Sequence, residues 1–279
     1  MKEFKGRVAV ITGGASGLGF AMAERAAKEG MKIVLADIEQ APLDKAVADL
    51  KVHGVEVVGM LTDVSKASDV DALAKKTIAR FGKVHLVCNN AGVGGIRVKA
   101  WEASLADWQW VLGVNVWGVI HGVRTFTPIM LEQDEPCHMV NTASVAGLLS
   151  PSGMSVYNVS KHAVVALSET LFQDLALAQA KLHVSVLCPA FVSTGIWNSA
   201  RNRPKELSVG IDSAEERRRA QEVKAVLDKG RLTAADVADM VFAAIVAEKF
   251  YIVTHAKIKG PVEIRMQDIL QDRNPTFTN

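Results

Sequence analysis

Cysteine is scarce in this chain of 279 residues, which contains only Cys88, Cys137 and Cys188. An odd number of scattered cysteines, mostly in apolar contexts, excludes a disulfide framework and favours buried thiols in a reducing compartment. Residues 1–6 run directly into a predicted strand, so we expect no signal peptide. These features predict a cytoplasmic protein.

An excess of either charge is also lacking. Lys and Arg number 32 against 30 Asp and Glu, for a net charge of +2, so we expect no nucleic-acid partner and no membrane partner. The seven histidines are dispersed, with none paired at metal-ligand spacing on a shared face, and we expect no metal site.

Charged residues are missing altogether from residues 136–160. That length could cross a bilayer, but the stretch contains Pro, Gly, Ser and Asn throughout. It is better interpreted as a buried strand followed by the dry wall of a pocket.

Apolar runs alternate with segments of helical period along the chain. The predicted strands cover residues 7–12, 32–37, 55–61, 84–89, 138–144, 182–188 and 250–254, and helices are expected at 18–29, 68–81, 155–180 and from 233 toward 247. Strands buried on both faces with helices between them predict an α/β fold, a doubly wound parallel sheet of about seven strands with helices on both faces.

No linker or repeat divides the chain, so we predict a single domain over residues 1–279. Residues 195–230, dense in both charge signs from 201 onward, are either solvated helix and loops or a lid over the carboxyl edge of the sheet. A C-terminal tail is expected at 256–279, with a helix at 262–270.

A glycine-rich turn follows the first strand and opens the first helix. Its glycines permit a tight turn and a close backbone approach, and the helix N-terminus offers N–H groups to a pyrophosphate. The position of this turn predicts a Rossmann-type dinucleotide site. The residues that would bind are Gly13, Ser16, Gly17, Leu18 and Gly19.

Asp37 ends the second strand, where a carboxylate would accept hydrogen bonds from ribose hydroxyls. Neither Ser16 nor Ile38 nor Glu39 is basic, so a 2′-phosphate would meet carboxylates, and NAD is favoured over NADP. After the third strand, Asp63 and Val64 could bind adenine. The fourth strand ends in small residues that would let a cofactor lie across it, namely Asn90, Ala91 and Gly92.

Tyr157 and Lys161 lie four residues apart and would share one helix face. A positive charge beside a phenol favours phenolate, so we expect the pKa of Tyr157 to fall from about 10. Ser144, thirteen residues before Tyr157, ends a predicted strand. Together the three side chains could bind a carbonyl oxygen and exchange a proton with it.

In this order, these motifs resemble those of the short-chain dehydrogenase/reductase family, over roughly residues 5–255. The matching residues are Thr12, Gly17 and Gly19, Asp63, residues 89–92, Asn115, Ser144, Tyr157, Lys161, Pro189 and Thr194. The resemblance implies a catalytic tetrad of Asn115, Ser144, Tyr157 and Lys161.

The resemblance assigns a role to each member. Tyr157 is the acid–base, Ser144 orients the substrate oxygen, Lys161 holds the nicotinamide ribose and lowers the tyrosine pKa, and Asn115 holds a water that relays protons. Pro189, Val192 and Thr194 would bind the nicotinamide end. Ala190 stands where the family usually has glycine, and the chain lacks the family's glycine-pair ending.

The family also implies a homo-oligomer, a dimer or tetramer packed through the Tyr157 helix. A finer resemblance, carried by Gly19–Phe20, residues 113–122 and residues 126–128, is to bacterial dehydrogenases acting on benzylic alcohols of aryl ethers.

The expected function is NAD-dependent hydride transfer to or from a hydrophobic secondary alcohol or ketone. Apolar residues would line the substrate pocket: residues 94–96 and 145–149, Met154 and Phe191, with Trp197 as a candidate contact. Arg201, Arg203 and residues 217–219 could instead recruit an acidic substrate. The alternatives are an NADPH-dependent 3-oxoacyl-thioester reductase and a non-catalytic NAD(H)-binding regulatory protein.

Overall fold

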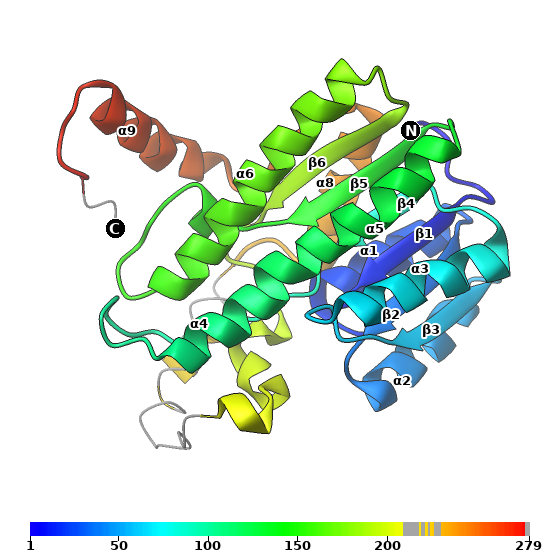
Figure 1. Cartoon of the computed structure of the whole chain (residues 1–279), viewed down its shortest axis with the longest axis horizontal. Helices are drawn as coiled ribbons and strands as arrows, with labels where there is room; N and C mark the ends of the chain where they lie inside the picture. Colours follow the sequence, from blue (N-terminus) through cyan, green and yellow to red (C-terminus); the bar gives the residue numbers. More distant parts are fainter. Residues whose placement is uncertain (209–217, 219–220, 223, 226–229, 277–279) are drawn as a thin grey trace.

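The computed structural model describes residues 1–208, 218, 221–222, 224–225 and 230–276. A seven-stranded parallel sheet forms its centre, in the order β3-β2-β1-β4-β5-β6-β7 (Figure 1). The strands are β1 (Val8–Thr12), β2 (Lys32–Asp37), β3 (Val57–Leu61), β4 (Leu86–Asn89), β5 (Cys137–Thr142), β6 (Leu182–Cys188) and β7 (Tyr251–Val253). The prediction of a doubly wound parallel sheet is confirmed.

Helices cover both faces of the sheet. One face packs against α1 (Gly17–Lys28), α2 (Gln40–Lys51) and α8 (Ala234–Val246), and the other against α3 (Ala67–Phe81), α5 (Gly118–Glu132) and α6 (Ser155–Leu177). Neighbouring β1 residues serve opposite layers, because side chains alternate along a strand. Ala9 and Ile11 pack with the α1 layer, whereas Val10 packs with the α3 layer.

Shorter elements complete the chain. Helix α4 (Leu105–Leu112) continues through a π-helical turn, η1 (Gly113–Trp117), into α5. The 3₁₀ turns are η2 (Val145–Gly147), η3 (Gly195–Asn202), η4 (Lys205–Leu207) and η5 (Ala256–Ile258), and α9 (Lys259–Leu270) follows. Helix α9 extends away from the sheet in Figure 1.

Local sequence features mark several helix ends in the structure. Gly30 and Gly82 follow α1 and α3 with φ of 74° and 76°, in the left-handed region that favours glycine. At the start of α8, the Thr233 hydroxyl accepts from the backbone N–H of Asp236, and the Asp236 carboxylate accepts from that of Thr233.

Strand order changes direction between β1 and β4. These two strands are neighbours, with Val10 opposite Val87, while β2 and β5 lie outside them. Parallel strands place their carboxyl ends on one edge, and a crevice opens where the order reverses. The predicted site residues follow β1, β2, β3, β4 and β5, so the fold brings them to this edge.

The predicted lid at 195–230 lies only partly within the described residues. Residues 195–208 are described, as η3 and η4, and most of the remainder lies outside them. The predicted tail helix is observed as α9, and residues 277–279 lie outside the described residues.

Candidate active site

The glycine turn between β1 and α1 is shaped by its lack of side chains. Gly13 and Gly17 have φ of 62° and 55°. A Cβ on Gly19 would lie 2.0 Å from the Gly13 carbonyl oxygen, so only glycine fits there. Ser16 precedes α1 in extended conformation, and its side chain makes no capping hydrogen bond. The helix N-terminus therefore presents its backbone N–H groups toward the cleft, an arrangement that suits a phosphate.

Asp37 braces this turn. One carboxylate oxygen accepts from the backbone N–H of Ala15 at 3.0 Å, and the other accepts from that of Glu39 at 3.1 Å. Each oxygen retains a second lone pair, so ribose hydroxyls can still be bound. Ile38 beside it is 45% exposed. Ribose binding by Asp37 stays a prediction, to which the structure adds a bracing role.

Asp63 and Val64 lie at the same edge but differ in environment. The Asp63 carboxylate accepts from the backbone N–H and hydroxyl of Ser65, at 3.0 and 2.7 Å. Val64 is buried and packs so tightly on α5 that a Cβ on Gly118 would lie 2.8 Å from it. Both residues line the cleft, as predicted for an adenine site.

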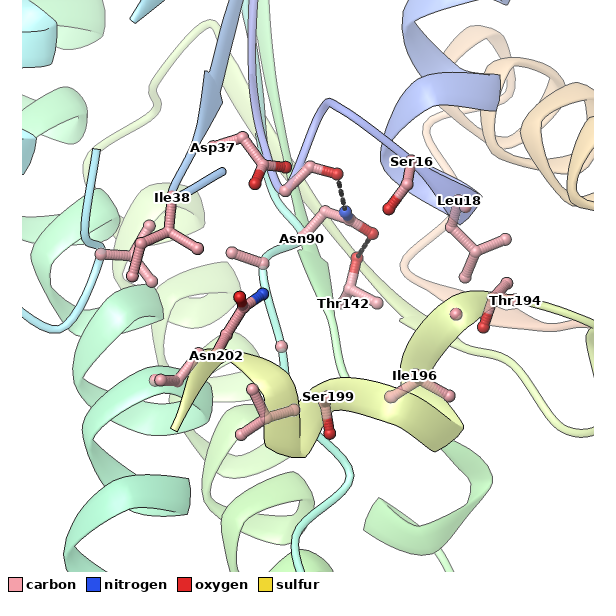
Figure 2. A pocket seen from close by; sticks show the side chains of 18 of the residues that line it. Ser16, Leu18, Asp37, Ile38, Asn90, Thr142, Thr194, Ile196, Ser199 and Asn202 are labelled. Carbon is pink, nitrogen blue, oxygen red and sulfur yellow. Dashed lines mark hydrogen bonds between the residues drawn. The ribbon is translucent and has the colours of Figure 1, made fainter. Parts of the chain in front are cut away.

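Asn90 ties the end of β4 to the glycine turn. Its side-chain amide donates to the Thr12 carbonyl at 2.9 Å, and its backbone N–H donates to the Thr12 hydroxyl oxygen at the same distance. The Asn90 amide oxygen accepts from the Thr142 hydroxyl at 3.4 Å (Figure 2). Strands β1, β4 and β5 are thus cross-linked at the floor of the cleft.

One cleft of about 1120 Å³, open to solvent, joins these features. It is lined by most of the predicted cofactor residues: Gly13, Ser16, Gly17, Leu18, Asp37, Ile38, Asp63, Val64, Asn90, Ala91, Gly92, Tyr157, Lys161, Pro189 and Thr194. Gly19 and Val192 do not line it. Gly19 is buried under the turn, and the Val192 side chain is buried in the core beside α8.

Tyr157 and Lys161 both reach this cleft from α6. The Lys161 ammonium lies 5.6 Å from the centre of the Tyr157 ring and donates to the Thr142 carbonyl at 3.0 Å. Lys161 is 3% exposed. Burial disfavours its charged form and lowers its pKa to about 8.

The expected fall in the tyrosine pKa is not observed. Burial raises the pKa of the Tyr157 phenol above its usual value, and a hydrogen bond with Ser144 only partly opposes that effect. The expectation was wrong because it weighed the lysine charge without the loss of water around both groups. Tyr157 is therefore a protonated phenol poised to donate a hydrogen bond.

Asn115 lies in the π-helical turn and has no exposed surface. Its side-chain oxygen accepts from the Val93 N–H at 2.8 Å, and its amide donates to the Val93 carbonyl at 3.0 Å and the Ser160 hydroxyl at 3.1 Å. These bonds fix the chain after β4 against α6. The relay-water role of Asn115 stays a prediction.

Ser144 follows β5 at the start of η2. Its hydroxyl oxygen accepts from the Ala146 N–H at 3.1 Å and donates to the Pro189 carbonyl at 3.4 Å. Ser144 is buried and is not among the residues that line the open cleft, but it interacts with the Tyr157 phenol. The structure brings Ser144, Tyr157 and Lys161 together, with Asn115 behind them.

The arginines proposed to recruit an acidic substrate are already engaged. Arg201 forms an ion pair with Glu39 at 2.6 Å, and Arg203 forms one with the buried Asp107 at the same distance. Residues 217 and 219 lie outside the described residues. Trp197 is partly buried and does not line the cleft, whereas its neighbour Ile196 does.

The tryptophans near Asn115 differ in their environments. Trp110 is buried and lines the cleft, which sequence reasoning missed, while Trp101 and Trp117 are exposed. The cleft also contains Thr142, Glu39, Arg201 and Asn202, none of which was predicted to bind cofactor. The strand-end position of Thr142 was a usable signal. No sequence signal indicated that Arg201 and Asn202 would line the cleft, because they follow β6 by more than a dozen residues.

Neither a membrane-spanning helix nor a metal-binding cluster is found among the described residues. None of the helices built from the described residues has both the length and the apolar character needed to cross a bilayer. Within the same residues, His, Cys, Asp and Glu side chains do not gather in groups of three or more that could hold a metal ion. Metal-free catalysis stays a prediction.

Comparison with known proteins agrees with this geometry. Residues 7–205 match the family model described as short chain dehydrogenase. The chain is 34% identical to a CLA biosynthesis dehydrogenase/reductase of Lactiplantibacillus plantarum, covering 99% of this chain and 97% of that protein. It is 30% identical to a C alpha-dehydrogenase of Sphingobium sp. strain SYK-6, covering 99% and 89%, which agrees with the finer resemblance found in the sequence.

A solved structure is also similar over the whole length. A short-chain dehydrogenase/reductase from Burkholderia phymatum, determined in complex with NAD, shares 50% identity with a TM-score of 0.96. The match covers 100% of this chain and 99% of that one.

Proposed function

The chain belongs to the short-chain dehydrogenase family of oxidoreductases, and we propose that it transfers hydride between NAD and a hydrophobic secondary alcohol or ketone. The observation that carries this proposal is the pair of Tyr157 and Lys161, which face the same cleft as the glycine turn. A proton donor and a dinucleotide-binding turn would then both lie beside the substrate carbonyl.

The cleft suits a dinucleotide without a 2′-phosphate. The glycine turn leaves room for a pyrophosphate at the N-terminus of α1, and the ribose end carries the carboxylates of Asp37 and Glu39. The Asp37 carboxylate would repel a 2′-phosphate, and the guanidinium of Arg201 at this end is already paired with Glu39. The NAD-bound Burkholderia relative supports the same choice.

Each catalytic side chain would either transfer a proton or hold another group in place. A bound nicotinamide supplies the hydride or accepts it. In reduction, the Tyr157 phenol donates its proton to the carbonyl oxygen as that oxygen gains charge, and in oxidation the phenolate takes the proton from the alcohol. Ser144 orients the oxygen, and the Lys161 ammonium stabilises the phenolate and holds ribose hydroxyls. Asn115 would hold a water that relays protons past Lys161, and its side chain also fixes Val93.

The substrate class follows from the surroundings of the phenol. Ala143, Trp110, Val114 and Ile196 line the cleft near the catalytic end, and the arginines at the rim are engaged elsewhere. An uncharged, apolar alcohol or ketone is therefore favoured over an acidic one. We also propose a homo-oligomer, a dimer or tetramer, as the family resemblance implies.

An absorbance screen of NADH formation over aliphatic, cyclic and aromatic secondary alcohols tests the activity. We expect turnover with at least one class, and a dissociation constant for NADH well below that for NADPH. Tighter binding of NADPH would contradict the cofactor assignment. Turnover restricted to carboxylate-bearing substrates would contradict the substrate class.

A further inference from the structure

Segment η3 crosses the open side of the cleft and is fastened at three points. At its start, Thr194 packs on the glycine turn, because a Cβ on Gly17 would lie 3.4 Å from the Thr194 side chain. In its middle, the Ser199 hydroxyl accepts from the Gly94 N–H at 3.0 Å. At its end, Arg201 reaches Glu39. These three fastenings lie on the loops that follow β1, β4 and β2.

The fastening at Glu39 has the geometry of a specific contact. Arg201 Nε donates to one carboxylate oxygen at 3.1 Å and Nη2 donates to the other at 2.6 Å, so the two groups meet fork to fork. Both side chains are partly buried, with 37% and 27% of their surface exposed. Arg201 also donates to the Asn198 carbonyl, which fixes the guanidinium at the end of η3.

Asn202 extends the same end of η3 into the cleft. Its side chain points toward the side where Asp37 and Ile38 lie (Figure 2). Its amide donates to the Glu39 carboxylate, which helps to lower the pKa of Glu39 and leaves the second amide N–H for a ligand. Asp37 and Ile38 were predicted to bind the adenosine half of the cofactor, and Thr194 the nicotinamide half. Thus η3 spans the full length of the proposed binding site, from one half of the dinucleotide to the other.

We propose that η3 is a clasp over the dinucleotide, held shut at the adenosine end by the Arg201–Glu39 ion pair, with the Asn202 amide contributing a hydrogen bond to the adenosine moiety. This inference rests on the proposed NAD site and adds two binding residues to it. A dinucleotide held between the strand ends and η3 leaves when the clasp detaches. Breaking the ion pair then accelerates dissociation more than it slows association.

The test measures dissociation of NADH, by its fluorescence, from the full chain after a chase with excess NAD. The variants are Glu39→Gln, Arg201→Ala and the double variant. We expect each single change to raise the dissociation rate about 3- to 10-fold, the range for a partly exposed, bidentate ion pair. The double variant should equal the singles rather than multiply them, because both changes remove one interaction.

Arg80→Ala is the matched control. Arg80 forms an ion pair of the same 2.6 Å length with Glu56, away from the cleft. Its dissociation rate for NADH should equal that of the wild type. For Asn202→Ala, binding of NADH and of ADP-ribose should weaken by a similar factor, because both contain the adenosine moiety.

The outcomes separate the two proposals. Wild-type protein that fails to bind NADH contradicts the proposed function itself. Two results would overturn the ion-pair fastening if the wild-type protein binds NADH. One is release of NADH from the single variants at the wild-type rate, and the other is single-variant effects that multiply in the double variant. Unchanged ADP-ribose affinity in Asn202→Ala overturns the amide contact.

Discussion

The two ends of the cleft depend on different parts of the chain, backbone groups at the glycine turn and side chains at the catalytic end. At the glycine turn, backbone groups would bind the cofactor, and side chains must be absent, since a Cβ on Gly19 would collide with Gly13. At the catalytic end, side chains would carry the chemistry, and burial raises the pKa of Tyr157 and lowers that of Lys161. The space available limits which side chains fit at the glycine turn. The free energy of burying a charge limits the protonation states at the catalytic end.

The difference predicts how each end responds to mutation. Removing the Tyr157 hydroxyl at the catalytic end should lower reactivity and leave cofactor binding nearly intact. Adding a methyl group at the turn should cost stability and cofactor binding together. Three substitutions test whether the ends are separable in this way.

The largest effect is expected for Tyr157→Phe. If Tyr157 is the acid–base, as proposed, its loss should lower kcat by about 10²- to 10⁴-fold. Affinity for NADH should change by less than about twofold, because the phenol ring is retained. Stopped-flow turnover and fluorescence titration measure the two quantities.

Tyr251→Phe is the control, since Tyr251 is the other of the two tyrosines in the chain and bonds to Glu169 at the surface. It should retain wild-type kcat. A Tyr157→Phe protein with more than a few per cent of turnover would remove the acid–base role.

The next effect concerns the buried lysine. Folding lowers the pKa of Lys161 from 10.5 to about 8, so below pH 8 the folded state holds a charge that burial disfavours. Lys161→Met should raise the free energy of unfolding of the cofactor-free protein at pH 7 by about 2–3 kcal/mol, while abolishing most activity.

The sign of its pH dependence follows from proton binding. Between pH 8 and 10.5 the unfolded lysine holds a proton that the folded one has lost, so the wild type gains stability as pH rises relative to Lys161→Met. Denaturant unfolding at pH 7, 8 and 9 should show the difference between the two proteins narrowing. A constant difference would mean that the ammonium is not strained by burial.

The smallest effect is expected for Gly19→Ala. Its methyl group must displace the Gly13 carbonyl or the Asn90 amide, and such overpacking costs about 1–3 kcal/mol of unfolding free energy. Weaker NADH binding should accompany the loss of stability. Gly260→Ala in α9, where a Cβ meets nothing within 4 Å, should show neither effect. Gly19→Ala with normal stability but lost turnover would erase the contrast between the two ends.

Local signals predicted most of the fold. The bounds of β2 and β6 match the predicted strands, and glycines end α1 and α3 where expected, because periodicity and turn chemistry act over short distances. The strand-end position of the site residues then followed from the parallel sheet. The direction of the tyrosine pKa shift was not predicted, because it depends on how far burial removes water from the Tyr157–Lys161 pair.

The remainder of the site depends on contacts between distant parts of the chain. Glu39 and Arg201 are 162 residues apart, and nothing in either neighbourhood indicates the pairing. Asn115 was predicted as a tetrad member from the family resemblance, but its hydrogen-bond partner, the Val93 backbone, is not identifiable from side-chain chemistry. Residue types predict which groups need partners, and the fold decides which partners they find.

The pairing of β1 with β4 also has a consequence for how the chain assembles. Ala9 lies beside Leu86, so the central ladder cannot begin until the ribosome has delivered β4. Until then β1 exposes an unpaired edge of apolar residues, and the late closure of so long a loop slows folding. The junction that opens the crevice thus joins strands that are distant in the sequence, and a ligand that binds across it would stabilise the folded chain.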